Sequence, residues 1–158
     1  MSAVTPPAAD SDPIPRPAWV LGLGGLIPFI AAAAIGWAPV AEMRQGALVA
    51  LAAYAAVILS FLGGVRWGAL LRDEPALSRW SPLGLAVLPS LIAWTALLLP
   101  AAAMLALLFA GLVLQFVLDA RAATRGELPR WYARLRVILS TGAAASVAAG
   151  FVAAIALG

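Results

Sequence analysis

Residues 46–71, GALVALAAYAAVILSFLGGVRWGALL, decide the fold of this chain. The stretch carries a single charge, at Arg66, and it exceeds the roughly 20 apolar residues that a helix needs to cross about 30 Å of hydrocarbon. It therefore predicts a membrane-spanning helix that has an arginine a few residues inside one end.

The composition of the whole chain agrees with a membrane protein. Of its 158 residues 64% are hydrophobic and 11% are charged, whereas a soluble domain is about 45–50% apolar and about 25% charged. The chain contains no cysteine and no histidine. Thiolate catalysis, iron–sulfur ligation and the usual zinc or haem sites are therefore not expected, and we predict neither a metal nor a cofactor.

The apolar segments predict one all-α domain of five transmembrane helices over residues 18–158. A proline-rich tail, residues 1–17, precedes it and is expected to be disordered and cytoplasmic. Pro100 cannot continue a helix, and it predicts a tight hairpin between the third and fourth spans. The five predicted helices cover residues 18–37, 46–71, 82–99, 101–118 and 134–157.

The arginines predict how the chain is threaded. Eight lie on the side shared by the N-terminus and the second and fourth loops, and only Arg44 lies on the other side. This asymmetry places the N-terminus in the cytoplasm and the C-terminus on the opposite side. Arginines in that setting contact anionic lipid headgroups, so we expect the lipid bilayer and not nucleic acid as a partner. The eight are Arg16, Arg72, Arg79, Arg121, Arg125, Arg130, Arg134 and Arg136.

Aromatic residues mark the same boundary. Amphipathic rings prefer the headgroup level of a bilayer. The residues that we expect to anchor the cytoplasmic interface are Trp19, Trp67, Trp80, Trp131 and Tyr132.

Small residues recur at a spacing of four in two of the predicted spans. Gly64 and Gly68 end such a series in the second span, and Gly142, Ser146 and Gly150 form one in the last. Membrane helices associate by close packing, which favours small residues at this spacing. We expect helix-packing seams within the molecule, with a homodimer face as the alternative.

Two prolines inside the predicted spans suggest irregular helices. Pro28 and Pro89 each remove a backbone hydrogen bond and free a carbonyl group. The expected result is an ordinary kink, and the alternative is a cavity of the kind that transporters build from broken helices.

The polar residues inside the spans form the candidate site. Gln115 and Asp119 are four residues apart, so they share one face of the fourth span at a depth comparable to Arg66. A charge within the membrane is costly unless it is paired or reaches water. We therefore predict a pocket in which Arg66 pairs with Asp119, lined also by Ser60, Gly63 and Gly64. In the alternative, Arg66 extends to the headgroups.

Four strings of the sequence resemble a bacterial membrane-protein family of unknown function that is related to mitochondrial transmembrane protein 69. The resemblance covers roughly residues 17–157 and implies the five-span fold and an inner-membrane location. The strings are ILSFLGGVRWGALL (58–71), LPSLIAW (88–94), LQFVLDAR (114–121) and LPRWYARLRVIL (128–139).

No phosphate-binding loop, nucleophile elbow or metalloprotease motif appears in the sequence, so we expect the protein not to be an enzyme. Our interpretation is an accessory or assembly factor that packs against partner membrane proteins. The alternative is a small transporter or channel that uses the pocket around Arg66, Gln115 and Asp119.

Overall fold

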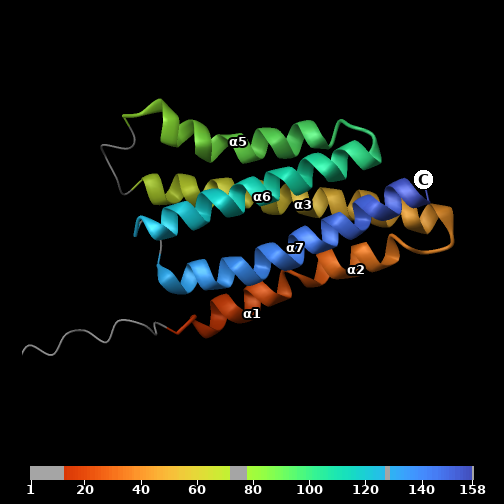
Figure 1. Cartoon of the computed structure of the whole chain (residues 1–158), viewed down its shortest axis with the longest axis horizontal. Coiled ribbons are helices and arrows are strands. Elements are labelled where there is room, and N and C mark those ends of the chain that lie inside the picture. The colour runs from red at the N-terminus through yellow and green to blue at the C-terminus, as the bar shows by residue number, and fades with distance from the viewer. Residues whose placement is uncertain (1–12, 72–77, 127–128, 158) are drawn as a thin grey trace, which may run out of the picture.

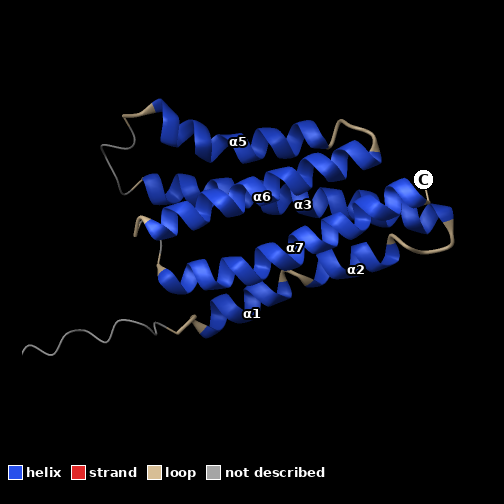
Figure 2. Ribbon diagram, in the orientation of Figure 1, coloured by secondary structure: helices blue, strands red, loops and turns tan. Residues whose placement is uncertain are grey.

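A computed structural model describes residues 13–71, 78–126 and 129–157, and this part of the chain is built from helices and turns (Figures 1 and 2). Most of the predicted tail and Arg72 lie outside the described residues. The helices are α1 (Arg16–Gly24), α2 (Ile27–Ile35), α3 (Ala41–Leu70), α5 (Trp80–Ala96), α6 (Ala101–Thr124) and α7 (Arg130–Ala156).

The helices run up and down in one elongated bundle, and the start of α1 and the end of α7 lie at opposite ends of it (Figure 1). Helices α3, α6 and α7 are each long and apolar enough to cross a membrane, as is the segment formed by α1 and α2 together, and α5 is a shorter apolar helix of 17 residues. The prediction of a five-helix membrane fold is confirmed.

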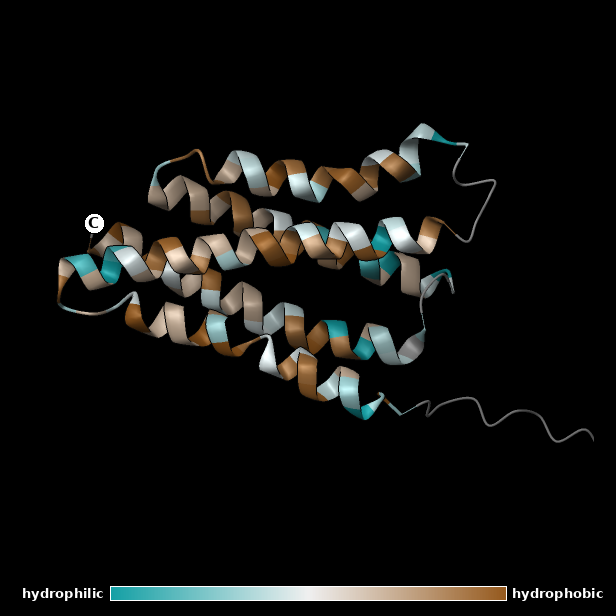
Figure 3. Cartoon of the chain, turned by 180° about the vertical axis from the view of Figure 1, so that it is seen from behind, coloured by the Kyte–Doolittle hydropathy of each residue, from teal (hydrophilic) through white to brown (hydrophobic). Residues whose placement is uncertain are grey.

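Charged residues gather at one end of the bundle, where α1, α5 and α7 begin and α3 and α6 end (Figure 1). We call this the arginine-rich end. The middle parts of the helices are mostly apolar (Figure 3). The described arginines of this end are Arg16, Arg66, Arg79, Arg121, Arg125, Arg134 and Arg136.

The first predicted span is broken into two helices. Its kink was expected at Pro28, but α1 ends at Gly24 and the chain turns through Gly25 before α2 begins. The reason is that Pro28 lacks the N–H that would bond to the Gly24 carbonyl, so the ladder fails one turn before the proline. Tyr54 Oη donates a 2.9 Å hydrogen bond to the Gly25 carbonyl oxygen and so satisfies a group that the break exposes.

The core surrounds α3, which packs against α2, α5, α6 and α7. Leu51 and Leu59 of α3 are fully buried, as are Leu105 and Leu108 of α6. Two glycines, one on α6 and one on α7, let these helices approach α3 closely. A Cβ atom at Gly111 would lie 2.6 Å from Leu59 Cδ2, and one at Gly150 would overlap the Leu51 side chain.

Arg44 ties two segments together at the end opposite the arginine-rich end. Its Nη2 donates a 2.8 Å hydrogen bond to the carbonyl oxygen of Leu157, just after α7, and its Nη1 donates to the carbonyl oxygen of Ala38 at 3.2 Å. A cation is favourable at the C-terminus of a helix. Arg44 therefore has a structural role in addition to the topological one.

Candidate functional site

A buried ion pair lies at the arginine-rich end of the bundle. Asp119, near the end of α6, accepts a 2.9 Å hydrogen bond from Arg136 Nε of α7 through its Oδ2 atom. The other carboxylate oxygen, Oδ1, accepts a 2.9 Å bond from Gln115 Nε2 one turn earlier on α6. The Asp119 and Arg136 side chains are only 9% and 8% exposed, so both charges are removed from solvent.

The predicted partner of Asp119 was therefore wrong, because the ion pair is made by Arg136 and not by Arg66. Helices α6 and α7 run antiparallel, and Asp119 lies about as far before the end of α6 as Arg136 lies after the start of α7. This arrangement brings the two side chains to the same level along the bundle axis. Arg66 lies on α3, and it forms no salt bridge with Asp119 in the described part of the chain.

Arg136 is thus the main residue that the sequence prediction missed. We had counted it among the arginines that set the topology. The available signal was its position near the start of α7, since residues equally far from the connected ends of two antiparallel helices lie at the same level.

Three buried polar atoms near this pair have no hydrogen-bond partner within the described part of the chain. They are Arg66 Nη1, Gln115 Oε1 and Ser140 Oγ. A buried polar group without a partner costs free energy, and most such groups in folded proteins are bonded to protein or to an ordered water. The cluster therefore has both donors and an acceptor free for a further polar group.

Two of the small residues predicted to line this cluster, Gly63 and Gly64, lie elsewhere. Gly63 faces α5, where a Cβ atom would come within 2.6 Å of the Ala86 carbonyl oxygen and would contact Pro89. Gly64 is exposed, and Ser60 is half-buried. The predicted polar pocket is thus reduced to the residues Arg66, Gln115 and Asp119, joined by Arg136.

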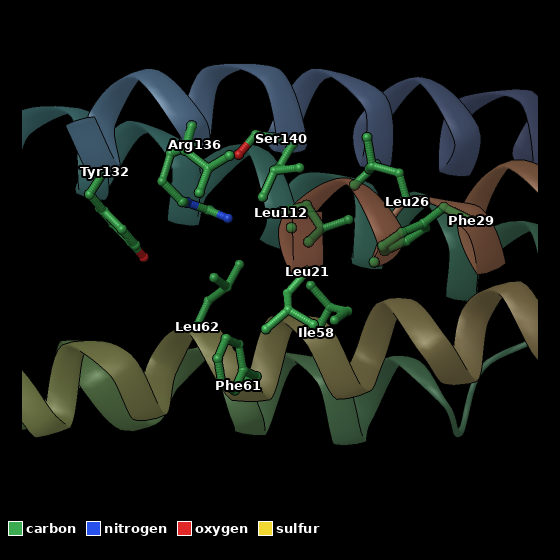
Figure 4. Close-up of a pocket in the computed structure, with 15 residues that line it drawn as sticks. Leu21, Leu26, Phe29, Ile58, Phe61, Leu62, Leu112, Tyr132, Arg136 and Ser140 are labelled. Atoms are coloured by element: carbon green, nitrogen blue, oxygen red, sulfur yellow. The ribbon is translucent and has the colours of Figure 1, made fainter. Parts of the chain in front are cut away.

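A cavity of about 300 Å³ opens beside the ion pair. Its walls are almost entirely apolar and come from α1, α2, α3 and α7, with Leu112 contributed by α6 (Figure 4). Arg136, Tyr132 and Ser140 supply the polar groups, and the Arg136 guanidinium points into the cavity in Figure 4. The apolar lining includes Leu21, Leu26, Phe29, Ile58, Phe61 and Leu62.

The predicted packing residues divide into two groups. Gly142, Ser146 and Gly150 pack within the molecule: a Cβ atom at Gly142 would lie 2.9 Å from Leu26 Cδ1, and Ser146 is buried. Gly64 and Gly68 face outward, and no described atom lies within 4 Å of the place where either Cβ would be.

The predicted interface anchors also divide. Trp19, Trp67 and Trp80 are exposed around the arginine-rich end, as a headgroup anchor must be. Trp131 is half-buried and contacts Tyr132 edge to face, with ring centroids 6.0 Å apart. Tyr132 lines the cavity, with its hydroxyl group directed inward (Figure 4).

Comparison with known proteins gives a consistent set of relatives. The family described as "Protein of unknown function (DUF3429)" matches residues 14–152. Transmembrane protein 69 of Xenopus tropicalis is 40% identical over 138 residues, which is 84% of this chain and 53% of the relative. Transmembrane protein 69 of Mus musculus is 31% identical over 130 residues, 78% of this chain and 51% of the relative. The chain spans about half the length of these curated relatives. No solved structure matches it.

Proposed function

We propose that this chain, which belongs to the DUF3429 family of membrane proteins of unknown function and is related to transmembrane protein 69, is a non-enzymatic accessory or assembly factor. It acts in the bacterial inner membrane by packing against partner membrane proteins.

The observation that carries this proposal is an outward stripe of small residues along α3. Residues at helical spacing of three or four keep one direction around a helix. On α3 these are Gly46, Ala50, Ala53, Val57, Phe61, Gly64 and Gly68; all of them are exposed, and all but Val57 and Phe61 are small. We call this set the α3 outer stripe.

Small residues on a membrane helix allow a neighbouring helix to approach closely, and close packing is the main force that joins helices in lipid. The other sides of α3 are covered by α2, α5, α6 and α7. At Gly64 and Gly68 no described side chain lies within 4 Å of the place where a Cβ atom would be, so this surface is open. The α3 outer stripe therefore has the properties of a docking surface for a helix of another protein.

A small transporter or channel is the second candidate, because the unpartnered polar atoms around Asp119 could serve a solute. The packing of the core favours the first candidate. Between the polar cluster and the opposite end, the interior is filled by fully buried Leu51, Leu59, Leu105 and Leu108. A permeation route needs polar lining or water along its length. Flux into proteoliposomes that is lost in Asp119→Ala would support transport instead.

The experiment that tests the proposal is purification of the tagged full chain in mild detergent, with identification and quantification of co-purified membrane proteins. A stoichiometric partner is expected with the unmodified chain. The double variant Gly64→Leu/Gly68→Leu is expected to lose most of it, since the leucine side chains hold a partner helix away.

Gly84→Leu of α5 is the matched control. Gly84 is also exposed, and a Cβ atom there would meet no described atom within 4 Å, but it lies outside the α3 outer stripe. The partner is expected to remain bound in this variant. Equal retention in all three proteins would contradict the proposal, and self-association that only the double variant abolishes would replace it with a homodimer.

A further inference from the structure

Among the residues that the structure describes, the charges of the polar cluster do not balance. Arg66 and Arg136 supply two guanidinium groups, and Asp119 is the one carboxylate that the structure describes at the arginine-rich end, because Glu42 lies at the opposite end. Asp119 is already bonded to Arg136 and Gln115. The described cluster therefore carries one net positive charge, and Arg66 Nη1 is buried without a hydrogen-bond partner.

An uncompensated charge within the membrane costs free energy, about 2.5–3.5 kcal/mol at the centre of a helix and less near the membrane surface. An anion between the two arginines would remove this cost. Guanidinium groups match phosphate well, since their planar N–H groups form paired, charge-assisted hydrogen bonds with two phosphate oxygens.

The cavity beside the cluster has the shape and polarity to hold the rest of such a ligand. Its volume of about 300 Å³ is at the small end of ligand sites, which suits one hydrocarbon chain better than a whole lipid. Its outer edge is formed by Leu21 and Phe61, which are 76% and 64% exposed, so it opens sideways toward the lipid phase.

The polar and apolar parts of the site are in the right order along the bundle. Leu62 lines the cavity, and Arg66 lies one turn beyond it on the same side of α3, toward the arginine-rich end. Tyr132 and Arg136 of α7 lie at this end of the cavity, level with Leu62, and Leu26 and Phe29 lie deeper (Figure 4). An amphiphile entering from the bilayer would place its charged group at the arginines.

We propose that the cavity between α1, α3 and α7 binds one acyl chain of an anionic phospholipid, whose phosphate is held by Arg66 beside the Arg136–Asp119 pair. Basic pockets between membrane helices are a known type of anionic lipid site. A quinone would fill the apolar part and leave the positive charge without a counterion, and a zwitterionic phospholipid would bring a second cation together with its phosphate.

The test is a lipid titration of the purified full chain by native mass spectrometry, with phosphatidylglycerol and phosphatidylcholine of identical chains. Phosphatidylglycerol is expected to bind at least about tenfold more tightly, the equivalent of one charge-assisted contact. Arg66→Gln is expected to abolish most of this preference. Arg121→Gln removes an exposed arginine at the same end of the bundle, and the preference is expected to persist in it.

A second pair of variants tests the acyl-chain cavity. Ile58→Phe fills space in the cavity and is expected to weaken phosphatidylglycerol binding, whereas Val57→Phe places the same side chain at an exposed neighbour and is expected not to. Equal binding of the two lipids by the unmodified chain would overturn the proposal, and this comparison requires no variant to fold. Equal effects of Arg66→Gln and Arg121→Gln would also overturn it. Because only the isolated chain is used, the result is independent of any protein partner.

Discussion

At the scale of single residues, the most informative feature is the set of hydrogen bonds that the Asp119 carboxylate accepts. Gln115 and Arg136 each occupy one of its oxygens, and Arg66 acts on it only through its charge. Breaking a buried pair by removing one partner leaves an uncompensated charge, whereas replacing both partners with apolar residues is often close to neutral.

We therefore predict that Asp119→Leu and Arg136→Leu each lower the free energy of unfolding by about 3–5 kcal/mol, and that the double variant loses less than either single one. Unfolding by SDS titration in mixed micelles measures these values. The matching cycle of Asp119 with Arg66→Leu is expected to give a smaller coupling energy. A larger coupling with Arg66 than with Arg136 would restore the pairing that the sequence alone suggested.

A second prediction concerns the hydroxyl group of Tyr54. Tyr54→Phe keeps the edge-to-face contact with Phe29, whose ring centroid is 4.9 Å away, but removes the hydrogen bond to the Gly25 carbonyl. The unfolding free energy is expected to fall by about 1–2 kcal/mol, because a carbonyl at the helix break loses its partner. The same SDS titration measures it. An unchanged stability would mean that the bond does not support the break between α1 and α2.

At the scale of the helices, two neighbouring glycines on α3 have opposite surroundings. Gly63→Ala places a methyl group within 2.6 Å of the Ala86 carbonyl oxygen, so α3 and α5 must separate, and a loss of about 1–3 kcal/mol is expected. Gly64→Ala meets no described atom, and it is expected to be neutral or to stabilise α3 by up to about 1 kcal/mol. Thermal unfolding of the two purified variants compares them directly. Similar losses at both positions would contradict the assigned α3–α5 contact.

The helices themselves were largely predictable from the sequence, because long apolar stretches have few alternatives in lipid. What the sequence did not provide was which faces meet. Periodicity assigned Gly64 and Gly68 to a seam, but it cannot tell a seam inside the molecule from one that faces outward. It also could not rank Arg66 and Arg136 as partners of Asp119, since that depends on which helix lies beside α6.

At the scale of the whole molecule, the main features lie at different levels along the bundle axis and on different sides of the bundle. The polar cluster and the cavity lie toward the arginine-rich end, Arg44 secures the opposite end, and the α3 outer stripe runs along the outside. All of this depends on α5, an apolar helix of only 17 residues, crossing the membrane like its neighbours. A four-span arrangement would place the turn between α5 and α6 on the wrong side.

Thiol labelling tests this threading directly, because the chain contains no cysteine. Single cysteines would replace Gln45, Leu98 and Ser78, and intact bacterial cells would be treated with a membrane-impermeant reagent. We predict labelling at Gln45→Cys and Leu98→Cys in intact cells, and labelling at Ser78→Cys only after the inner membrane is permeabilised. Labelling of Leu98→Cys and Ser78→Cys under the same single condition would show that α5 does not cross, and it would contradict the five-span bundle.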